Sequence, residues 1–273
     1  MNHGLINDPR THDAVAGIIP FVVRNPSGDW IQWLPAGETQ SKPVETFACV
    51  SYSLLHCLET QEYFLTGKRI RYSARWLAKI SGTTGAGNYL VSVAQAVQQY
   101  GLVREETWPT PANYTWDSFY AEPTPTERQI LLAEGQEWLK THKFQWEWLT
   151  TNLADILQHI TQCPLQVTLP GHAVQNFFTQ QEIVNYFDTY LPFSKTTNRS
   201  NLTDAFKPLL TMKLMRLVND NGTYYLRGDK GKIGLADIGA LNALQEIEST
   251  TETGSTQGIP QVGIFESGLT FHK

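Results

Sequence analysis

Two side chains far apart in the chain have the types needed for nucleophilic thiol catalysis. Cys49 lies in Phe47-Ala48-Cys49-Val50-Ser51, where a loop is predicted to become a helix, and His172 lies in Gly171-His172-Ala173-Val174. A thiol becomes an effective nucleophile when an imidazole takes its proton and a third polar group holds the imidazole in place. Asp188 follows His172 along the chain and is the candidate for that third group.

The predicted place of Cys49 at a helix start also bears on its acidity. The N-terminus of a helix carries partial positive charge, and an imidazolium adds more, so both are expected to lower the pKa of the thiol. The backbone N–H of Cys49 would point toward an oxyanion that develops during attack on a carbonyl. A nearby side-chain amide would complete this oxyanion hole.

The elements that must position these groups fall into two halves of the chain. Apolar residues at helical spacing predict a helix from Cys49 to about Phe64, which Gly67 ends. After residue 163 the sequence is rich in β-branched and aromatic residues, which predicts strands over 165–169, 172–179 and 182–190. A helical half followed by a β-rich half is an α+β arrangement, in which His172 meets Cys49 across the interface.

Further elements follow from the same patterns. Asn88 is predicted to cap the N-terminus of a helix that Gly101 ends. Residues 1–45 are predicted to be irregular apart from a short strand over 17–23. The additional predicted helices cover 75–80, 89–100, 127–140 and 152–161.

The composition excludes several classes of protein. With 273 residues, 41% of them hydrophobic, the chain can form one large domain or two modest ones with a substantial core. A net charge of −5 argues against nucleic-acid binding, and no apolar run is long enough for a transmembrane helix. The three cysteines form no Cys-x-x-Cys and no helix carries His-x-x-x-His, so we expect neither a metal site nor a cofactor.

Several short motifs stand in a fixed order around the cysteine and the histidine. They are Asp29-Trp30 followed by Gln40, Cys49-Val50-Ser51-Tyr52-Ser53, the glycine-rich segment 82–88, the segment 100–109, Gly171-His172-Ala173-Val174 and Asp188-Thr189-Tyr190. Over roughly residues 26–193 this order resembles that of the papain-like cysteine peptidases. The resemblance implies a papain-like fold with a helical N-terminal lobe, a β-rich C-terminal lobe and an active-site cleft between them.

The resemblance also implies roles for individual residues. Cys49 corresponds to the nucleophile, His172 to the base and Gln40 to the glutamine that completes the oxyanion hole. The segment 82–88 falls where the family binds the substrate backbone, which implies a substrate-binding role for Gly85 and Gly87. The implied activity is hydrolysis of peptide bonds in a polypeptide substrate through an acyl-enzyme.

The sequence departs from the family pattern at several points. Gln40 lies farther from Cys49 than the family's glutamine does, so residues 41–44 would be an insertion, and Glu45 is nearer. Asp188 stands where the family has asparagine, although an aspartate also orients an imidazole and stabilises its cation. The long N-terminal inhibitory segment of the family is not expected here, because most residues before Cys49 are needed for the fold.

Structural roles are the simpler interpretation for several other residues. Cys57 and Cys163 are expected to be small buried hydrophobic residues, as most helix cysteines are. Asn185 is an alternative partner for His172, but strand alternation places residues 185 and 188 on opposite faces, so only one of them can reach the ring.

The C-terminal residues suggest a second interpretation of the whole chain. The strands predicted at 212–218 and 223–227 flank Asn219-Asp220-Asn221-Gly222, a strong hairpin signal, and a further strand follows at 231–236. This part resembles a small β module found on bacteriophage-encoded proteins. The alternative function is therefore a non-catalytic papain fold that binds phage structural proteins or another assembly. A third candidate is a Cys-His cell-wall amidase, although those families usually place the histidine nearer the cysteine.

The predicted domain organisation follows from these observations. Residues 1–210 form the peptidase-like domain, with the helical lobe at about 45–162 and the β lobe at about 163–193. Residues 211–245 form the hairpin module, and 246–273 form a polar linker and an apolar tail. The start of the chain lacks a signal-peptide pattern and the cysteines form no disulfide framework, so we expect a cytoplasmic or virion-associated protein.

Overall fold

A computed structural model describes residues 3–6 and 21–212 with their side chains and, beyond residue 212, the backbone of five strands. The chain divides into two compact units, residues 1–139 with 144–210 and residues 140–143 with 211–273. Every candidate site residue lies in the first unit. A short strand was predicted over residues 17–23. Residues 17–20 lie outside the described residues, and residues 21–23 form no strand.

The helical elements of the described chain lie mostly in its first half. They are η1 (Ile31–Trp33), α1 (Cys49–Thr66), α2 (Ala74–Ile80), α3 (Leu90–Tyr100), α4 (Trp116–Phe119), α5 (Pro125–Thr141), α6 (Leu153–Ile160) and η2 (Arg199–Asn201).

Six strands form one sheet in the order β1-β6-β2-β3-β4-β5. Their bounds are β1 (His142–Leu149), β2 (Leu165–Leu169), β3 (His172–Gln180), β4 (Ile183–Phe187), β5 (Ser194–Asn198) and β6 (Asp204–Met212). The sheet thus extends beyond the predicted β lobe at 163–193, because β1, β5 and β6 were not predicted.

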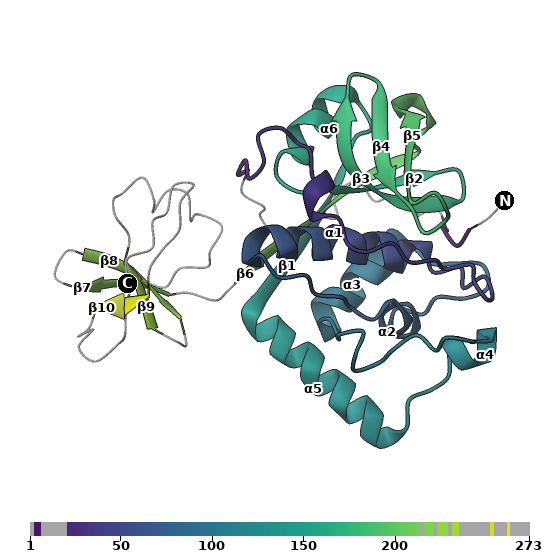
Figure 1. The fold of residues 1–273 in the computed structure, drawn as a ribbon, viewed down its shortest axis with the longest axis horizontal. Coiled ribbons are helices and arrows are strands. Elements are labelled where there is room, and N and C mark those ends of the chain that lie inside the picture. The colour runs from purple at the N-terminus through teal and green to yellow at the C-terminus, as the bar shows by residue number, and fades with distance from the viewer. Residues whose placement is uncertain are drawn as a thin grey trace. The chain divides into compact units, whose positions relative to one another are not determined.

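The helix α1 is the central element of the first unit. Residues 49–62 are all buried, as expected of a helix enclosed on every side. Figure 1 shows α1 between the sheet and the other helices, and it contacts β2 and β3 as well as α2 and α3. Gly67 ends α1 in the left-handed conformation, as predicted, with φ at 68°. This arrangement places the N-terminus of α1, and with it Cys49, where the two halves meet.

The predicted cap of α3 is wrong in detail. Tyr89 is the N-cap residue, and Asn88 instead donates its side-chain amide to Ser81 and to Thr83 Oγ1. Asn88 therefore fixes the loop over residues 81–88. The predicted end of α3 at Gly101 is confirmed.

Three strands and one turn position the second half of the site. Strands β3, β4 and β5 are antiparallel neighbours, and Tyr186 of β4 pairs with Lys195 of β5. The backbone N–H of Asp188 donates to Phe193 O at 2.8 Å, which closes the turn between β4 and β5. Side chains two residues apart on a strand share a face, so Asp188 and Lys195 come to the same face of the sheet.

Two of the three hydrophobic clusters in the described chain support this frame. The first surrounds α1, α2 and α3, and contains Cys49, Val50 and Ala173. The second lies between the sheet and α6 and includes Trp30, which is fully buried and donates its Nε1–H to Ile160 O at 2.7 Å. Within the described chain, no helix combines the length and apolar character that a bilayer span requires.

The second unit contains a five-stranded sheet of order β10-β7-β8-β9-β11. The strands are β7 (Arg216–Asp220), β8 (Thr223–Gly228), β9 (Gly231–Gly234), β10 (Glu252–Thr253) and β11 (Gln261–Val262). The hairpin of β7 and β8 agrees with the predicted one. The strands β10 and β11 fall within the predicted linker and tail, whose other residues lie outside the described chain. The predicted domain boundaries stay a prediction.

Candidate active site

Cys49 is the first residue of α1, as its sequence context predicted. Its sulfur lies beside the backbone N–H of Ala173, the residue after His172, and beside that of Val50. Phe47, two residues before, has a positive φ of 53°, which is unusual for a residue with a side chain. The chain therefore turns sharply just before it enters α1.

The acidity of Cys49 differs from the sequence-based expectation. The side chain is fully buried, and this burial raises the pKa of the thiol to about 12, although the N–H of Ala173 acts in the opposite direction. Desolvation disfavours the thiolate, and here it outweighs the helix terminus. In the described state, the thiol is protonated near neutral pH.

His172 begins β3 and is held by Asp188. Its Nε2 lies 2.7 Å from Asp188 Oδ1, and both side chains are buried. The other ring nitrogen, Nδ1, is buried and has no hydrogen-bond partner among the described residues. Because Nδ1 lies on the opposite side of the ring from Asp188, it is the nitrogen left to exchange a proton with a thiol.

Asp188, not Asn185, is the residue that reaches the imidazole. Asn185 donates its side chain to Phe178 O at 3.4 Å instead. Burial would raise the pKa of Asp188, but hydrogen bonds and charges of His172 and then of Lys195 lower it to about 2. Asp188 is therefore an anion throughout the neutral range and can stabilise an imidazolium.

Gln40 lies within the same constellation despite its distance from Cys49 in sequence. Its side-chain Oε1 accepts from Thr189 Oγ1 at 3.0 Å, next to Asp188. The backbone N–H of Thr46 donates to Gln40 O at 3.0 Å, so the extra residues 41–44 form a closed loop outside this contact. The insertion thus leaves Gln40 beside the turn that carries Asp188.

The amide of Gln40 is oriented by two further side chains. Gln40 Nε2 donates to Glu45 Oε1 at 2.7 Å and to Tyr190 Oη at 3.0 Å, while Tyr190 donates to the other Glu45 oxygen. Glu45 is therefore an acceptor that fixes Gln40 rather than an oxyanion donor itself.

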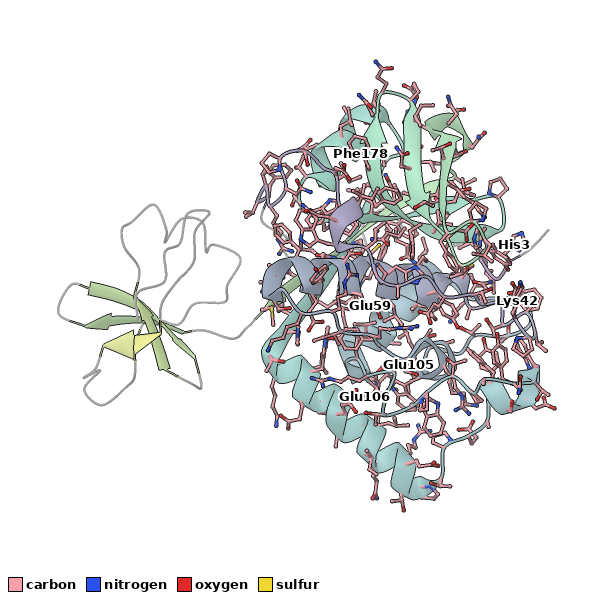
Figure 2. All side chains as sticks on the ribbon, in the orientation of Figure 1. His3, Lys42, Glu59, Glu105, Glu106 and Phe178 are labelled. Atoms are coloured by element: carbon pink, nitrogen blue, oxygen red, sulfur yellow. The ribbon has the colours of Figure 1, made fainter. Side chains whose placement is uncertain are left out.

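Residues 3–6 lie across this constellation. The backbone N–H of His3 donates to Gly171 O at 2.8 Å, and His3 O accepts from Gln40 Nε2 at 2.9 Å. The His3 ring lies 5.1 Å from that of His172 between centroids. Figure 2 shows His3 at the edge where the sheet meets the helical half. The backbone carbonyl of His3 thus accepts a hydrogen bond from the amide that is expected to stabilise the oxyanion.

The same segment continues along the glycine-rich loop. Leu5 forms a parallel bridge with Asn88, in which Asn88 N–H donates to Gly4 O at 2.8 Å. A Cβ on Gly87 would stand 2.0 Å from Gly4 O, so only glycine allows this approach. Gly85, the other predicted substrate-binding residue, is exposed and a Cβ there would meet nothing within 4 Å.

The other two cysteines are buried away from this constellation. Cys57 lies within α1 and Cys163 precedes β2; both are fully buried, and neither forms a disulfide within the described part of the chain. In the described part of the chain, no group of three His, Cys, Asp or Glu side chains is arranged to hold a metal ion.

Three residues near the site were given no role in it by the sequence, although Glu45 and Tyr190 stand next to the motif residues. Glu45 and Tyr190 fix Gln40, and Lys195 donates to Asp188 Oδ2 at 2.7 Å. Tyr190 ends the motif Asp188-Thr189-Tyr190, but its contact with Gln40 depends on residues distant in sequence. Lys195 could have been found from hairpin pairing, if β5 had been predicted.

The fold resembles solved structures of cysteine proteases. The ragweed pollen allergen Amb a 11, a cysteine protease in its proform, matches with a TM-score of 0.51 and 13% identity, over 72% of this chain and 71% of that one. Digestive procathepsin L 3 of Tenebrio molitor larval midgut matches with a TM-score of 0.51 and 14% identity, over 76% of both chains. No protein-family model and no curated protein sequence matches the chain. The chain therefore has a papain-like α+β fold, as expected from its motifs.

Proposed function

We propose that the protein is a cysteine peptidase with Cys49 as nucleophile, His172 as base and Asp188 as the group that orients the base. The observation that carries this proposal is the geometry of His172. Its Nε2 is held by the buried Asp188 carboxylate, while its Nδ1 is buried on the side away from Asp188 and has no hydrogen-bond partner among the described residues. The Cys49 sulfur lies beside the backbone N–H of Ala173, the residue that follows His172. This is the arrangement that a base needs to take a proton from a thiol.

In the proposed reaction, His172 takes the thiol proton and the sulfur attacks the carbonyl carbon of a peptide bond. The developing oxyanion is stabilised by the backbone N–H of Cys49 and by Gln40 Nε2. His172 then gives its proton to the leaving amine as the C–N bond breaks, which leaves a thioester on Cys49. Water, activated by His172, hydrolyses this thioester and restores the thiol.

The reaction requires residues 3–6 to leave their position. Cys49 is fully buried, and Gln40 Nε2, which would donate to the oxyanion, donates to the carbonyl of His3 instead. Displacement of the segment would free Gln40 and admit solvent to the thiol, and the pKa of Cys49 would then fall toward its ordinary value because the desolvation is relieved.

Hydrolysis of unstructured polypeptides tests the proposal, with two cysteine variants as a matched pair. Cys49→Ala should abolish turnover, whereas Cys57→Ala, which changes another fully buried cysteine of the same helix, should retain it. Equal activity of the two variants would contradict the assignment. The measurements should use reducing conditions and variants shown to be folded.

The complete burial of Cys49 also favours a second candidate, a non-catalytic papain fold that binds a partner in an assembly. Phage structural proteins are the partners that the C-terminal module suggests. The two candidates differ in one outcome. Once residues 3–6 are displaced, a peptidase reacts with a thiol-directed peptidyl electrophile, and a non-catalytic fold does not.

A further inference from the structure

The carboxylate of Asp188 is contacted on both of its oxygens. Oδ1 accepts from His172 Nε2 and from the backbone N–H of Thr189, each at 2.7 Å, and Oδ2 accepts from Lys195 Nζ at 2.7 Å. Asp188 is only 4% exposed, whereas the Lys195 side chain is 25% exposed. The ammonium therefore lies at the surface end of a chain of contacts that runs inward to the imidazole.

We propose that Lys195 is a positioning residue, which holds Asp188 in the orientation that keeps its Oδ1 on His172 throughout the reaction. This inference deepens the proposed function and rests on it. A buried carboxylate needs a charged partner at every stage, since an uncompensated buried charge is strongly unfavourable. His172 Nε2 contacts Oδ1 and Lys195 Nζ contacts Oδ2, so the contact with Lys195 lies on the oxygen that takes no part in the proton transfer at His172.

The geometry of the sheet explains why Lys195 can serve in this way. Lys195 pairs with Tyr186 across β4 and β5, and Asp188 lies two residues beyond Tyr186 on the same face. The turn between the strands is closed by the hydrogen bond from Asp188 N–H to Phe193 O. Backbone hydrogen bonds thus fix the distance over which the two side chains meet.

Where the papain-like family has a neutral asparagine, this chain has an aspartate, so its site contains a charge that asparagine would not bring. The ion pair with Lys195 offsets that charge on the side away from the imidazole. This pairing gives Lys195 a role that depends on Asp188 and that should vanish when Asp188 is made neutral.

Other ionisable groups face the pair and must be considered in any pH measurement. His3 of the segment 3–6, Glu45, Cys49 of α1 and the phenols of Tyr186 and Tyr190 surround Asp188 and His172. Glu45 also interacts with His3 and with Cys49. Within the described residues, the side chains of His172 and Lys195 donate hydrogen bonds to Asp188, and both lower its pKa.

The first test is independent of catalysis. The full chain is labelled at its aspartate carboxyl carbons, and the NMR titration of Asp188 is assigned with Asp188→Asn. Lys195→Met should shift the Asp188 titration upward by about one pH unit, because one of its two charged partners is lost. Lys195→Arg should restore the low value, and Lys68→Met, which removes an exposed lysine elsewhere, should change nothing.

The second test uses peptidase activity. Lys195→Met should lower kcat roughly ten- to a hundredfold with little change in KM, because the imidazole is less well oriented. Lys195→Met should also move the acid limb of the kcat–pH profile to higher pH. Lys195→Arg should recover most of the lost kcat. In an Asp188→Asn background the same substitution should change kcat by less than about twofold, since the two residues act as a unit.

The outcomes separate this inference from the proposed function. An unchanged Asp188 titration in Lys195→Met, or an equal loss of kcat with and without Asp188, would overturn the positioning role even in an active peptidase. An inactive wild-type protein in which the Asp188 titration still responds to Lys195 supports the contact, and it is then the proposed function that fails.

Discussion

Gln40 donates its side-chain amide to the backbone carbonyl of His3 across 2.9 Å. The same amide is the one that the proposed reaction needs for its oxyanion, so a segment of the chain and a substrate carbonyl compete for one donor. Contacts of His3 with Gly171 and of Leu5 with Asn88 hold the segment at both ends. In the proposed mechanism, residues 3–6 must therefore be displaced before Cys49 can react with a substrate.

Gly4→Ala is expected to release this segment. Gly4 has a φ of 109°, and a Cβ there would stand 2.0 Å from Phe47 O, so alanine is both strained and in collision with backbone. Strain of this kind favours the displaced state, and the rate of Cys49 alkylation should rise roughly tenfold or more. Gly85→Ala, where a Cβ meets nothing, is the matched control and should leave the rate unchanged. A Gly4→Ala variant that reacts no faster would indicate that other residues cover the thiol.

The pH dependence of the same alkylation should change with the segment. Burial raises the pKa of Cys49 to about 12, so thiolate forms in the closed state only at high pH. Exposure relieves the desolvation, and the midpoint of the alkylation rate should move down toward the ordinary value of 9.0 or below in Gly4→Ala. Stopped-flow alkylation with a small neutral reagent over a pH series measures both midpoints. Identical midpoints in the two proteins would disagree with this account.

Gln40→Ala is expected to act on the chemical step. Loss of one oxyanion donor typically lowers kcat by about a hundredfold or more, while KM changes little. Gln136→Ala, at an exposed position of α5, serves as the control. A variant with altered KM and normal kcat would place Gln40 in substrate binding instead. Steady-state kinetics on a peptide substrate distinguish the two.

Asp188→Asn is expected to change how stability depends on pH. The folded-state pKa of Asp188 is about 2, below its ordinary value of 3.8, so the ionised side chain stabilises the fold above pH 3.8 and this contribution is lost as the pH falls through 2. The shift corresponds to about 2 kcal/mol of the free energy of unfolding. Urea denaturation across this range should show a steeper acid loss for the wild type than for Asp188→Asn. If the free energies of unfolding of the two proteins changed in parallel with pH, the pKa of Asp188 would not be lowered in the folded state.

Part of the fold was predictable because its signals are local. The start of α1 at Cys49 and its end at Gly67 follow from apolar spacing and a left-handed glycine. The strand β1 also had a signal, since Phe144, Trp146 and Trp148 alternate with polar residues, but it was not recognised. The strand β5 has none, because Ser194–Asn198 is a polar edge strand without an apolar face.

The site was predictable only where a motif accompanied the residue. Cys49, His172 and Asp188 were singled out by motif and order, and the structure brings His172 and Asp188 into contact. The segment 3–6 could not be identified, because its position depends on partners such as Asn88 and Gly171 that are distant in sequence. The raised pKa of Cys49 escaped prediction for the same reason, since burial is a tertiary property.

Mapping the covalent adduct of a thiol-directed peptidyl electrophile by mass spectrometry is the most direct test of whether Cys49 is the nucleophile. The measurement uses the full chain under reducing conditions, as wild type and as Gly4→Ala, each with and without His172→Ala. We expect a single adduct on Cys49, formed faster in Gly4→Ala and suppressed by His172→Ala. An adduct on Cys57 or Cys163 alone, or a Cys49 that stays unmodified after the segment is displaced, would contradict it.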